Sequence, residues 1–553
     1  MRVDQAVGQT LARLGVEHAF GVIGSGNLIA TNALVAGGAA FVPARHEGGA
    51  VTMADAYARV TGRVGVCSVH QGPGLTNTMT GLTEAAKSRT PLVVLAADTP
   101  AADIRSNFRI DQDAMVAAVG AVPERVYGPD TAVADTVRAY RRALAERRAV
   151  VLMLPLDVAA GQVSEPVGPG VDVEVDAGWL PPDPPAPAPE AVGTLADALA
   201  GGSRPLLLAG RGAVRDGAGA ALAALADQTG ALLATSAVAN GLFAGNPWSL
   251  GISGGFASPL AAELIAAADV VIGFGVSFTG WTTRRGRLIG PAATLAQVDL
   301  DAAALGAHRP VDLGVIGGVG QTARALSAEL RRRGHRPAGW RTPDLAGRIA
   351  AGQWPDVPYS DASTDTRIDP RALSVALAEI LPAERTVVTD SGHFMGFPAM
   401  YLSVPDAAGF VFTQAFQSIG LGLASAIGAA LARPDRLTVA ALGDGGALMG
   451  LSELETACRL SLHLLVVVYN DAAYGAEVHH FGPMGEPLDL VRFPDTDFAA
   501  LARGLGAQGA TVRRRADLAA VAEWLEGGRS GPFVLDARVV PTVVADWLAD
   551  AFR

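Results

Sequence analysis

The sequence predicts an α/β protein of three doubly wound domains, each built on a parallel sheet. Short runs that are apolar throughout alternate with segments of helical periodicity along the chain. Strands without alternating polar positions are typical of parallel sheets, because helices cover both faces of such sheets. Two irregular, proline-containing stretches divide the alternation into three blocks. The length of 553 residues agrees with about three or four domains of ~150 residues.

The domain limits follow from these two stretches. The run LPPDPPAPAPE cannot form a regular helix or a central strand, because its prolines lack the backbone N–H and fix the backbone. HRPAGWRTPD and QWPDVPYSD mark the second stretch. We expect an N-terminal domain over residues 1–165, a linker over 166–190, a central domain over 191–333, a second linker over 334–366 and a C-terminal domain over 367–553.

Each block supplies its strands and helices in order. Residues 1–22 have the pattern of an amphipathic helix followed by a strand. In the first domain VCSV and PLVVLAAD are strand-like, and the helix-like GLTEAAKS lies between them. The strand candidates of the central domain are RPLLLAG, DVVIGFG and TLAQVDLD, and those of the third are TVVTD, LTVAALGD and HLLVVVYND. Ligands bind at the carboxyl ends of parallel strands, so we expect the functional residues directly after these runs.

Composition favours a small-molecule ligand in a reducing compartment. The net charge of -11 comes from scattered acids, which argues against a nucleic-acid partner. Cys67 and Cys458 lie far apart without a CxxC or Cys/His cluster, so neither a disulfide framework nor a zinc site is indicated. The N-terminus lacks the pattern of a signal peptide, and polar residues or glycine interrupt the apolar runs. We expect a cytoplasmic protein without a membrane segment.

A glycine-rich turn with an acid follows one of the buried strands of the third block. Gly443, Asp444, Gly445 and Gly446 come directly after LTVAAL, where glycines allow a sharp turn and a close approach of the backbone to phosphate oxygens. A carboxylate beside phosphate is unfavourable unless a cation lies between them, and Mg²⁺ prefers oxygen ligands. The next strand delivers Asp471 to the same edge of the sheet. The turn and the strand end would each be ordinary if found alone, but together they indicate a metal site.

This Gly-Asp-Gly turn and the Asn-Asp pair that follows it resemble the diphosphate-binding motif of thiamine diphosphate enzymes. The resemblance implies that Asp444, the side chain of Asp471 and the carbonyl of Ala473 bind Mg²⁺. It places Gly443, Gly445, Gly446 and Tyr474 at the cofactor. Asp471 departs from the usual pattern because it adds a negative charge to the site, which affects metal affinity and its pH dependence.

The first block resembles the pyrimidine-binding domain of the acetolactate synthase and 2-oxo acid decarboxylase superfamily. The order of HEG, helix, strand, GPGLTN and helix carries this resemblance, which extends over most of the chain and is weakest in the middle third. It implies that Glu47 shares a proton with the pyrimidine ring of the cofactor and so activates the thiazolium carbon. Gly72, Pro73 and Asn77 would shape the backbone around the cofactor. A glutamate that only flanks the start of a helix is the alternative for Glu47.

Two further residues of this block resemble those of benzoylformate decarboxylase. Ser25 lies in the first glycine turn and His70 precedes GPGLTN, where that enzyme pairs a serine with a histidine. His70 could orient a carboxylate or move a proton, and the alternative is a structural histidine at a strand end. The second histidine of such decarboxylases has no clear match, because the comparable segment contains Trp281 and two arginines. This departure weakens the assignment as a pure decarboxylase.

The third block contains further candidates that the resemblance places. His393 would contact the diphosphate, the Gln417 carbonyl would accept a hydrogen bond from the aminopyrimidine, and Ile419 would hold the cofactor bent. Glu477 and His480 would line the substrate pocket on the helix after the metal motif. The alternatives are a loop histidine for His393, a core side chain for Ile419 and a solvated helix face for the last pair.

The resemblance implies a carboligase of the acetolactate synthase type. Such an enzyme decarboxylates a 2-oxo acid such as pyruvate and joins the product to a second carbonyl compound. A 2-oxo acid decarboxylase that forms no new bond is the first alternative, and an inactive cofactor-binding or regulatory protein is the second. Acetolactate synthases hold FAD in the central domain, so FAD is a further candidate, although the turn at Gly210 and Gly212 is only part of a nucleotide-binding motif. The resemblance also implies a homodimer or homotetramer with active sites between subunits.

Overall fold

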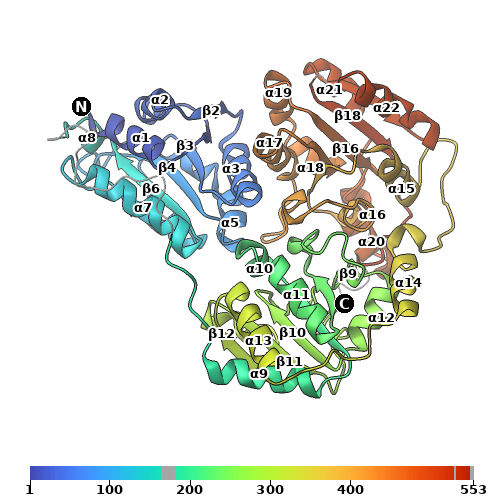
Figure 1. Ribbon diagram of the computed structural model, residues 1–553. Coiled ribbons are helices and arrows are strands. Elements are labelled where there is room, and N and C mark those ends of the chain that lie inside the picture. The colour runs from blue at the N-terminus through green and yellow to red at the C-terminus, as the bar shows by residue number, and fades with distance from the viewer. Residues whose placement is uncertain (164–180, 529–530, 549–553) are drawn as a thin grey trace.

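The computed structural model describes residues 1–163, 181–528 and 531–548. These residues form three six-stranded sheets whose paired strands are all parallel, with helices between successive strands (Figure 1). The structure thereby confirms the predicted fold class. Most of the expected linker over 166–190 lies outside the described residues. Its last part, residues 181–188, contains neither helix nor strand.

The N-terminal sheet has the strand order β2-β1-β3-β4-β6-β5. Its strands are β1 His18–Gly21, β2 Ala40–Pro43, β3 Gly65–Val69, β4 Leu92–Asp98, β5 Val122–Arg125 and β6 Ala149–Pro155. The helices around it are α1 Val3–Arg13, α2 Leu28–Ala36, α3 Glu47–Thr61, α4 Pro73–Thr76, α5 Met79–Lys87, α6 Gln112–Ala118, α7 Ala132–Glu146 and α8 Leu156–Ala159. From β1 the chain continues to β2 on one side of the sheet and then crosses to β3 on the other side. Ligands usually bind at the carboxyl ends of two strands that flank such a switch point.

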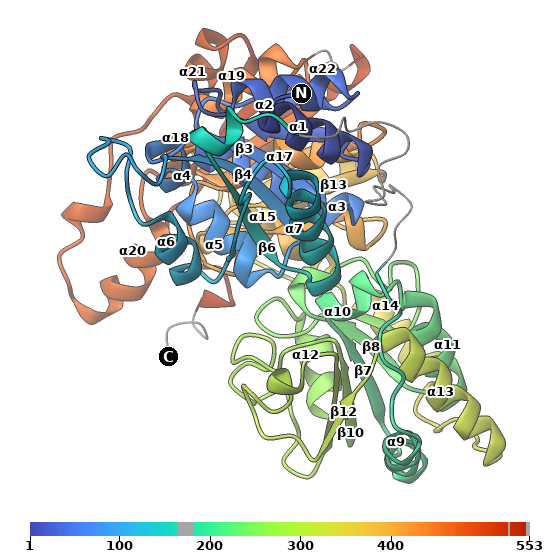
Figure 2. The same cartoon turned by 90° about the vertical axis from the view of Figure 1, so that its left-hand side faces the viewer.

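The central sheet has the order β12-β11-β10-β7-β8-β9. Its strands are β7 Pro205–Ala209, β8 Leu232–Thr235, β9 Ser249–Ile252, β10 Val270–Phe274, β11 Thr294–Asp299 and β12 Leu313–Ile316. Its helices are α9 Pro189–Gly201, α10 Arg211–Arg215, α11 Gly219–Thr229, α12 Pro259–Ala266, α13 Val319–Arg332 and α14 Pro343–Ala351. This domain has hydrophobic cores of its own and lies to one side of the other two (Figure 2). Arg215 of α10 joins it to the N-terminal domain by donating to the carbonyls of Ser88 and Arg89.

The C-terminal sheet has the order β14-β13-β15-β16-β18-β17. Its strands are β13 Arg385–Thr389, β14 Phe410–Phe412, β15 Leu437–Gly443, β16 Leu464–Asn470, β17 Gln508–Val512 and β18 Phe533–Arg538. Its helices are α15 Pro370–Ile380, α16 Gly396–Tyr401, α17 Gly422–Ala432, α18 Asp444–Met449, α19 Ser452–Arg459, α20 Gly475–Phe481, α21 Phe498–Gly504 and α22 Ala519–Glu526. Among the described residues, no helix is both long enough and apolar enough to span a membrane.

Helices α3 and α17 join the N- and C-terminal domains through one hydrophobic core, to which both sheets contribute (Figure 1). The two backbones approach closely because Gly428 of α17 faces α3. A Cβ atom at Gly428 would lie 2.1 Å from the carbonyl oxygen of Met53. The glycine is therefore required by packing and not by its own backbone angles.

Substitution of Gly428 by alanine should separate these two helices. We expect Gly428→Ala to lower the free energy of unfolding by about 1–3 kcal/mol, because the added methyl group overpacks the contact. Gly347 of α14 is the matched control, since a Cβ atom there would meet nothing within 4 Å. Gly347→Ala should raise stability by about 0.5–1 kcal/mol. Thermal unfolding measures both, and equal effects of the two changes would contradict the close contact.

Candidate active site

Two acids meet at the carboxyl edge of the C-terminal sheet. Strands β15 and β16 are paired, with Gly443 opposite Tyr469, so that Asp444 and Asp471 emerge side by side. Their exposed fractions are 8% and 7%. Burial raises the pKa of both carboxyls, and the charge of Asp444 raises the pKa of Asp471 further. The free energy cost of two adjacent buried carboxylates would fall if a cation bound between them.

The surroundings of this pair fit a divalent cation. The nearest described basic group is His393, whose Nδ1 lies 3.7 Å from Asp471 Oδ2. Burial, with a smaller contribution from His479, lowers the pKa of His393 to about 3, so this histidine is neutral at pH 7 and leaves the acids uncompensated. The described residues contain no group of three or more histidine, cysteine or acidic side chains that could hold a metal. A third protein ligand would therefore be a carbonyl, as expected for Ala473.

Glycines bring the backbone close to these acids. A Cβ atom at Gly445 would lie 2.6 Å from the ring of Tyr474, and one at Gly446 would lie 2.4 Å from Asp390 Oδ2. Gly443 is the last residue of β15, and α18 starts immediately afterwards with Asp444. Gly445 and Gly446 are therefore required by packing, and the predicted turn lies between β15 and α18.

The segment before α17 is held in an unusual conformation. Gln417 has a backbone φ of 62°, a value that residues other than glycine seldom adopt. Ser391 Oγ lies 3.1 Å from Gln414 Oε1 and 3.4 Å from the Gln417 carbonyl, so its single proton can be donated to either oxygen. Buried Asp390 accepts hydrogen bonds from the N–H groups of Gly420 and Leu421, at 2.8 and 3.3 Å. These contacts fix the backbone next to Ile419.

Charged residues of the N-terminal domain hold the same segment from the other side. Glu84 Oε2 accepts a hydrogen bond from the backbone N–H of Phe416 at 2.6 Å, and Arg59 donates to Glu84 Oε1 at 2.9 Å. Arg59 also contacts Asp55 at 2.6 Å and the carbonyl of Phe412 at 3.0 Å. Burial opposes ionisation of Glu84, but Arg59 and the Phe416 N–H outweigh it and lower the pKa of this carboxyl. The sequence analysis did not single out Asp55, Arg59 or Glu84, because this group contacts a segment that is distant in the chain.

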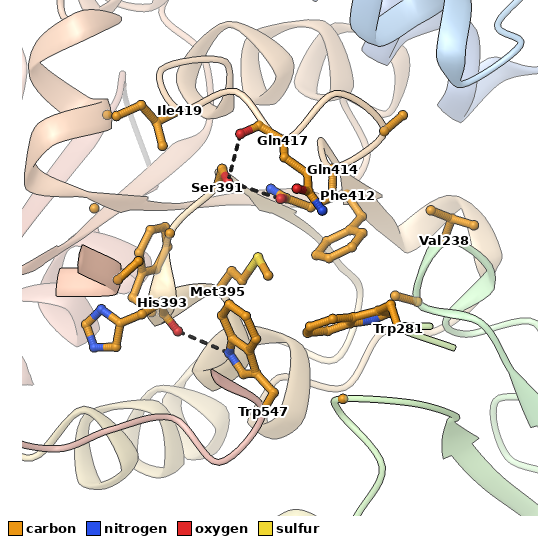
Figure 3. A pocket seen from close by; sticks show the side chains of 18 of the residues that line it. Val238, Trp281, Ser391, His393, Met395, Phe412, Gln414, Gln417, Ile419 and Trp547 are labelled. Carbon is orange, nitrogen blue, oxygen red and sulfur yellow. Dashed lines mark hydrogen bonds between the residues drawn. The ribbon is translucent and has the colours of Figure 1, made fainter. Parts of the chain in front are cut away.

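A cavity of about 1160 Å³ lies between the central and C-terminal domains (Figure 3). It brings together most of the site residues that the sequence predicts for the third block, namely His393, Gln417, Ile419, Gly443, Asp444, Gly445, Gly446, Asp471, Ala473, Tyr474 and Glu477. Of the pair predicted for the substrate pocket, Glu477 lines the cavity and His480 does not. The helix α20 turns His480 toward Phe481, with ring centroids 4.6 Å apart. The cavity also contains residues that the sequence did not single out, among them Ser391, Gln414 and Trp547.

The site residues of the first block form a second group. Glu47 is the first residue of α3, and Asn77 Nδ2 donates to its Oε2 at 2.9 Å. Gly72 has a φ of 62° and precedes Pro73, the first residue of α4. The Gly72 N–H donates to the side chain of Gln112 at 2.9 Å, which fixes this turn. The structure thus places Glu47 and the GPGLTN turn in contact, as the resemblance implies for a shared site.

Ser25 and His70 belong to this second group. Ser25 Oγ lies 3.2 Å from His70 Nε2, and His70 Nδ1 lies 2.9 Å from the carbonyl oxygen of Gln71. Because a carbonyl only accepts, Nδ1 carries a proton and Nε2 of the neutral ring accepts from the serine. A Cβ atom at Gly24 would lie 2.3 Å from His70, so the glycine turn makes room for this pair. The pair can hold and move a proton.

The two groups do not share one cavity within the chain. None of Glu47, Ser25, His70, Gly72 or Asn77 is among the described residues that line the large cavity. Helix α3 packs against α17. The backbone N–H of His46, directly before Glu47, donates to Glu453 of α19 at 3.0 Å.

Comparisons with known proteins identify three domains of one enzyme family. Residues 1–117 match the N-terminal TPP binding domain of thiamine pyrophosphate enzymes, residues 192–326 the central domain, and residues 390–537 the C-terminal TPP binding domain. The chain is 32% identical to a probable 2-ketoarginine decarboxylase of Pseudomonas aeruginosa, over 97% of this chain and 94% of that protein.

Two further relatives differ in their named activities. The acetolactate synthase large subunit of Parasynechococcus marenigrum is 30% identical over 92% of this chain and 83% of its own. A sulfoacetaldehyde acetyltransferase of Alcaligenes xylosoxydans xylosoxydans is 28% identical over 93% and 88%. The chain therefore belongs to the acetolactate synthase-like superfamily of enzymes that use thiamine pyrophosphate, also called thiamine diphosphate.

Proposed function

We propose that the protein is a 2-oxo acid decarboxylase that replaces the carboxylate of its substrate by a proton. The reaction consumes R–CO–COO⁻ and H⁺ and yields R–CHO and CO₂. The hydrogen bond between Ser25 and His70 carries this proposal, because the pair can supply the proton that ends the reaction as an aldehyde. The relative named as a 2-ketoarginine decarboxylase supports it.

The chain's own residues divide the remaining work. Thiamine diphosphate, when bound, supplies an electron sink beside the substrate carbonyl. Asp444, Asp471 and the Ala473 carbonyl would hold Mg²⁺ against its diphosphate, since two buried acids need a cation. Glu47 would exchange a proton with the pyrimidine ring, and the Gln417 carbonyl would orient the amino group of that ring. FAD in the central domain and a cytoplasmic location stay predictions from the sequence.

Carboligation, as the sequence predicts, is the second candidate. The acetolactate synthase among the relatives supports this alternative. The fate of the acyl group separates the two candidates, because ligation forms a carbon–carbon bond and decarboxylation alone does not.

Product analysis with ¹³C-labelled 2-oxo acids tests the reaction. Holoenzyme with thiamine diphosphate and Mg²⁺ should release CO₂ and aldehyde, detected by NMR. Glu47→Gln should slow the reaction at least about 100-fold, because acid–base catalysis contributes about 10²–10⁴-fold, while cofactor binding and thermal stability are retained. Enzyme treated with EDTA is the control for the metal. An acyloin as the main product would favour the carboligase, and an unchanged rate in Glu47→Gln would refute the role of this residue.

We further propose that the active form is a homodimer, or a tetramer made of two such dimers. In each dimer, one copy supplies Glu47, Ser25 and His70 to a site, and the other copy supplies the metal-binding residues. The separation of the two groups within one chain supports this assembly. Large apolar side chains are exposed beside each group. Leu448 and Met449 follow the metal motif with 47% and 58% exposed, and Ile23 and Leu28 flank Ser25 with 38% and 43% exposed. Surfaces of this kind mark contacts between chains.

Mixed dimers of two inactive variants test this arrangement. Glu47→Gln and Asp444→Ala should each be inactive alone, but a dimer with one copy of each would contain one intact site. Random mixing, in which about half of the dimers are mixed, should restore about a quarter of the wild-type activity. The two variants are unfolded and refolded together, and each variant refolded alone is the control. A mixture that stays inactive although mixed dimers form would place Glu47 and Asp444 of one chain in the same site.

The contact of Glu84 with Phe416 should matter for cofactor affinity. Glu84→Gln removes a charge-assisted hydrogen bond, worth about 1.5–3 kcal/mol, from the segment that contains Gln417. We expect the Kd for thiamine diphosphate to rise about tenfold, with kcat at saturating cofactor nearly unchanged. Asp369→Asn is the matched control, because buried Asp369 also accepts backbone hydrogen bonds, from Ala362 and Arg371, away from this segment. Isothermal titration would show equal Kd values for both variants if Glu84 were only structural.

A further inference from the structure

One side of the cavity is aromatic and comes from three separate segments (Figure 3). Trp281 follows β10 of the central domain, Phe412 ends β14, and Trp547 belongs to the C-terminal segment. The rings of Trp281 and Trp547 meet edge to face with centroids 5.0 Å apart. Phe256 supports both from behind, at 5.1 Å from Trp281 and 6.2 Å from Trp547. We call Trp281, Phe412 and Trp547 the aromatic wall.

The positions of the two indoles are fixed by their neighbours. A Cβ atom at Gly255 would lie 2.6 Å from the Trp281 ring, and one at Gly396 would lie 2.5 Å from the Trp547 ring. Trp547 also donates its Nε1–H to the carbonyl of His393 at 3.2 Å. Because His393 lies beside Asp471, this bond ties the aromatic wall to the metal side of the cavity. Close packing and one hydrogen bond thus hold the two indoles in place.

The opposite side of the cavity is polar. Ser391, Gln414 and the backbone of Gln417 lie across from the two tryptophans (Figure 3). The side-chain nitrogen of Gln414 is buried and has no hydrogen-bond partner in the described part of the chain. A buried donor of this kind is costly unless a ligand accepts from it. A molecule with an anionic head and an apolar tail fits between these two sides.

The size and charge of the tail follow from the lining. A methyl group, as in pyruvate, is too small to cover both indoles, whereas a phenyl or indole ring stacks well against tryptophan edges and faces. A cationic tail is disfavoured, because Lys87, Arg211 and Arg284 line the same cavity. Among the described residues that line the cavity, Glu477 at the start of α20 is the one acid beyond the pair assigned to the metal.

We propose that the substrate is a 2-oxo acid with a neutral aromatic side chain, whose ring packs against Trp281 and Trp547 of the aromatic wall. This inference rests on the proposed decarboxylation and names the class of substrate for it. Trp281 and Trp547 are then specificity-determining residues, while the chemistry depends on the groups described above. Their contacts with the ring are the same before and during the reaction, so they should act on KM more than on kcat.

Steady-state kinetics of the holoenzyme test the proposal with three substrates, namely phenylpyruvate, pyruvate and a 2-oxo acid with a guanidino side chain. We expect kcat/KM to be highest for phenylpyruvate, by about tenfold or more over pyruvate. Trp281→Leu and Trp547→Leu should each lower kcat/KM for phenylpyruvate about 5–10-fold, mainly through KM, and change that for pyruvate less than about twofold. Trp524→Leu is the matched control, because Trp524 and Trp547 are both 5% exposed and Trp524 does not line the cavity.

A binding measurement separates this inference from the proposed reaction. Holoenzyme carrying Glu47→Gln is titrated calorimetrically with phenylpyruvate, with and without Trp281→Leu. Binding that Trp281→Leu weakens about 5–10-fold supports the aromatic wall as a binding site even if no substrate is decarboxylated, in which case only the proposed reaction fails. A preference for pyruvate or the guanidino acid, equal losses for all substrates in the wall variants, or binding of phenylpyruvate that is unaffected by Trp281→Leu would overturn the inference.

Discussion

The packing of α3 against α17 is the contact on which the arrangement of the site depends. Helix α3 spans Glu47–Thr61, so its first residue and Arg59 in its last turn are about 18 Å apart along the axis. Arg59, through Glu84, holds the segment that contains Gln417 in its own chain. Glu47, at the opposite end, is not among the described residues that line that cavity. Helix α3 thus contributes Arg59 to the support of the cavity and Glu47 to the second group of site residues. Close packing at Gly428 fixes the position of this helix.

The acids of the site are all buried, and their partners explain why their pKa values shift in opposite directions. Glu84 is buried but meets Arg59 and a backbone N–H, so its charge is stabilised and its pKa is lowered. Asp444 and Asp471 are buried next to each other beside a neutral histidine, so their pKa values are raised. The charge of Glu84 is therefore compensated by partners within the protein. For Asp444 and Asp471, the compensating charge would come from the cation that we propose to bind there.

The relatives are similar to this chain over most of its length but are named for different reactions. In this chain the turn after β15 and the end of β16 are fixed by parallel pairing. The aromatic wall is assembled differently, from the central domain, from β14 and from the C-terminal segment. Residues on separate segments can change without disturbing the sheet. Such positions are therefore suited to select the substrate, while the sheet edge keeps the cofactor in place.

The sequence by itself determined the fold class, and it predicted which residues lie at the carboxyl edge of the C-terminal sheet. Apolar strands followed by glycine and acid, as at Gly443 and Asp444, predict a parallel sheet and a ligand at its carboxyl end, because both signals depend on neighbours in the chain. It also placed Ser25 near His70, which the structure joins by a hydrogen bond.

Only the tertiary structure decided which distant side chains complete the site. The role of Glu84, the exclusion of His480 from the cavity and the meeting of Trp281 with Trp547 depend on how three domains and a C-terminal segment pack. Such contacts join residues that are hundreds of positions apart, and no local pattern in the sequence encodes them. Local patterns fix backbone conformation and strand ends, whereas packing between domains fixes the walls of the cavity.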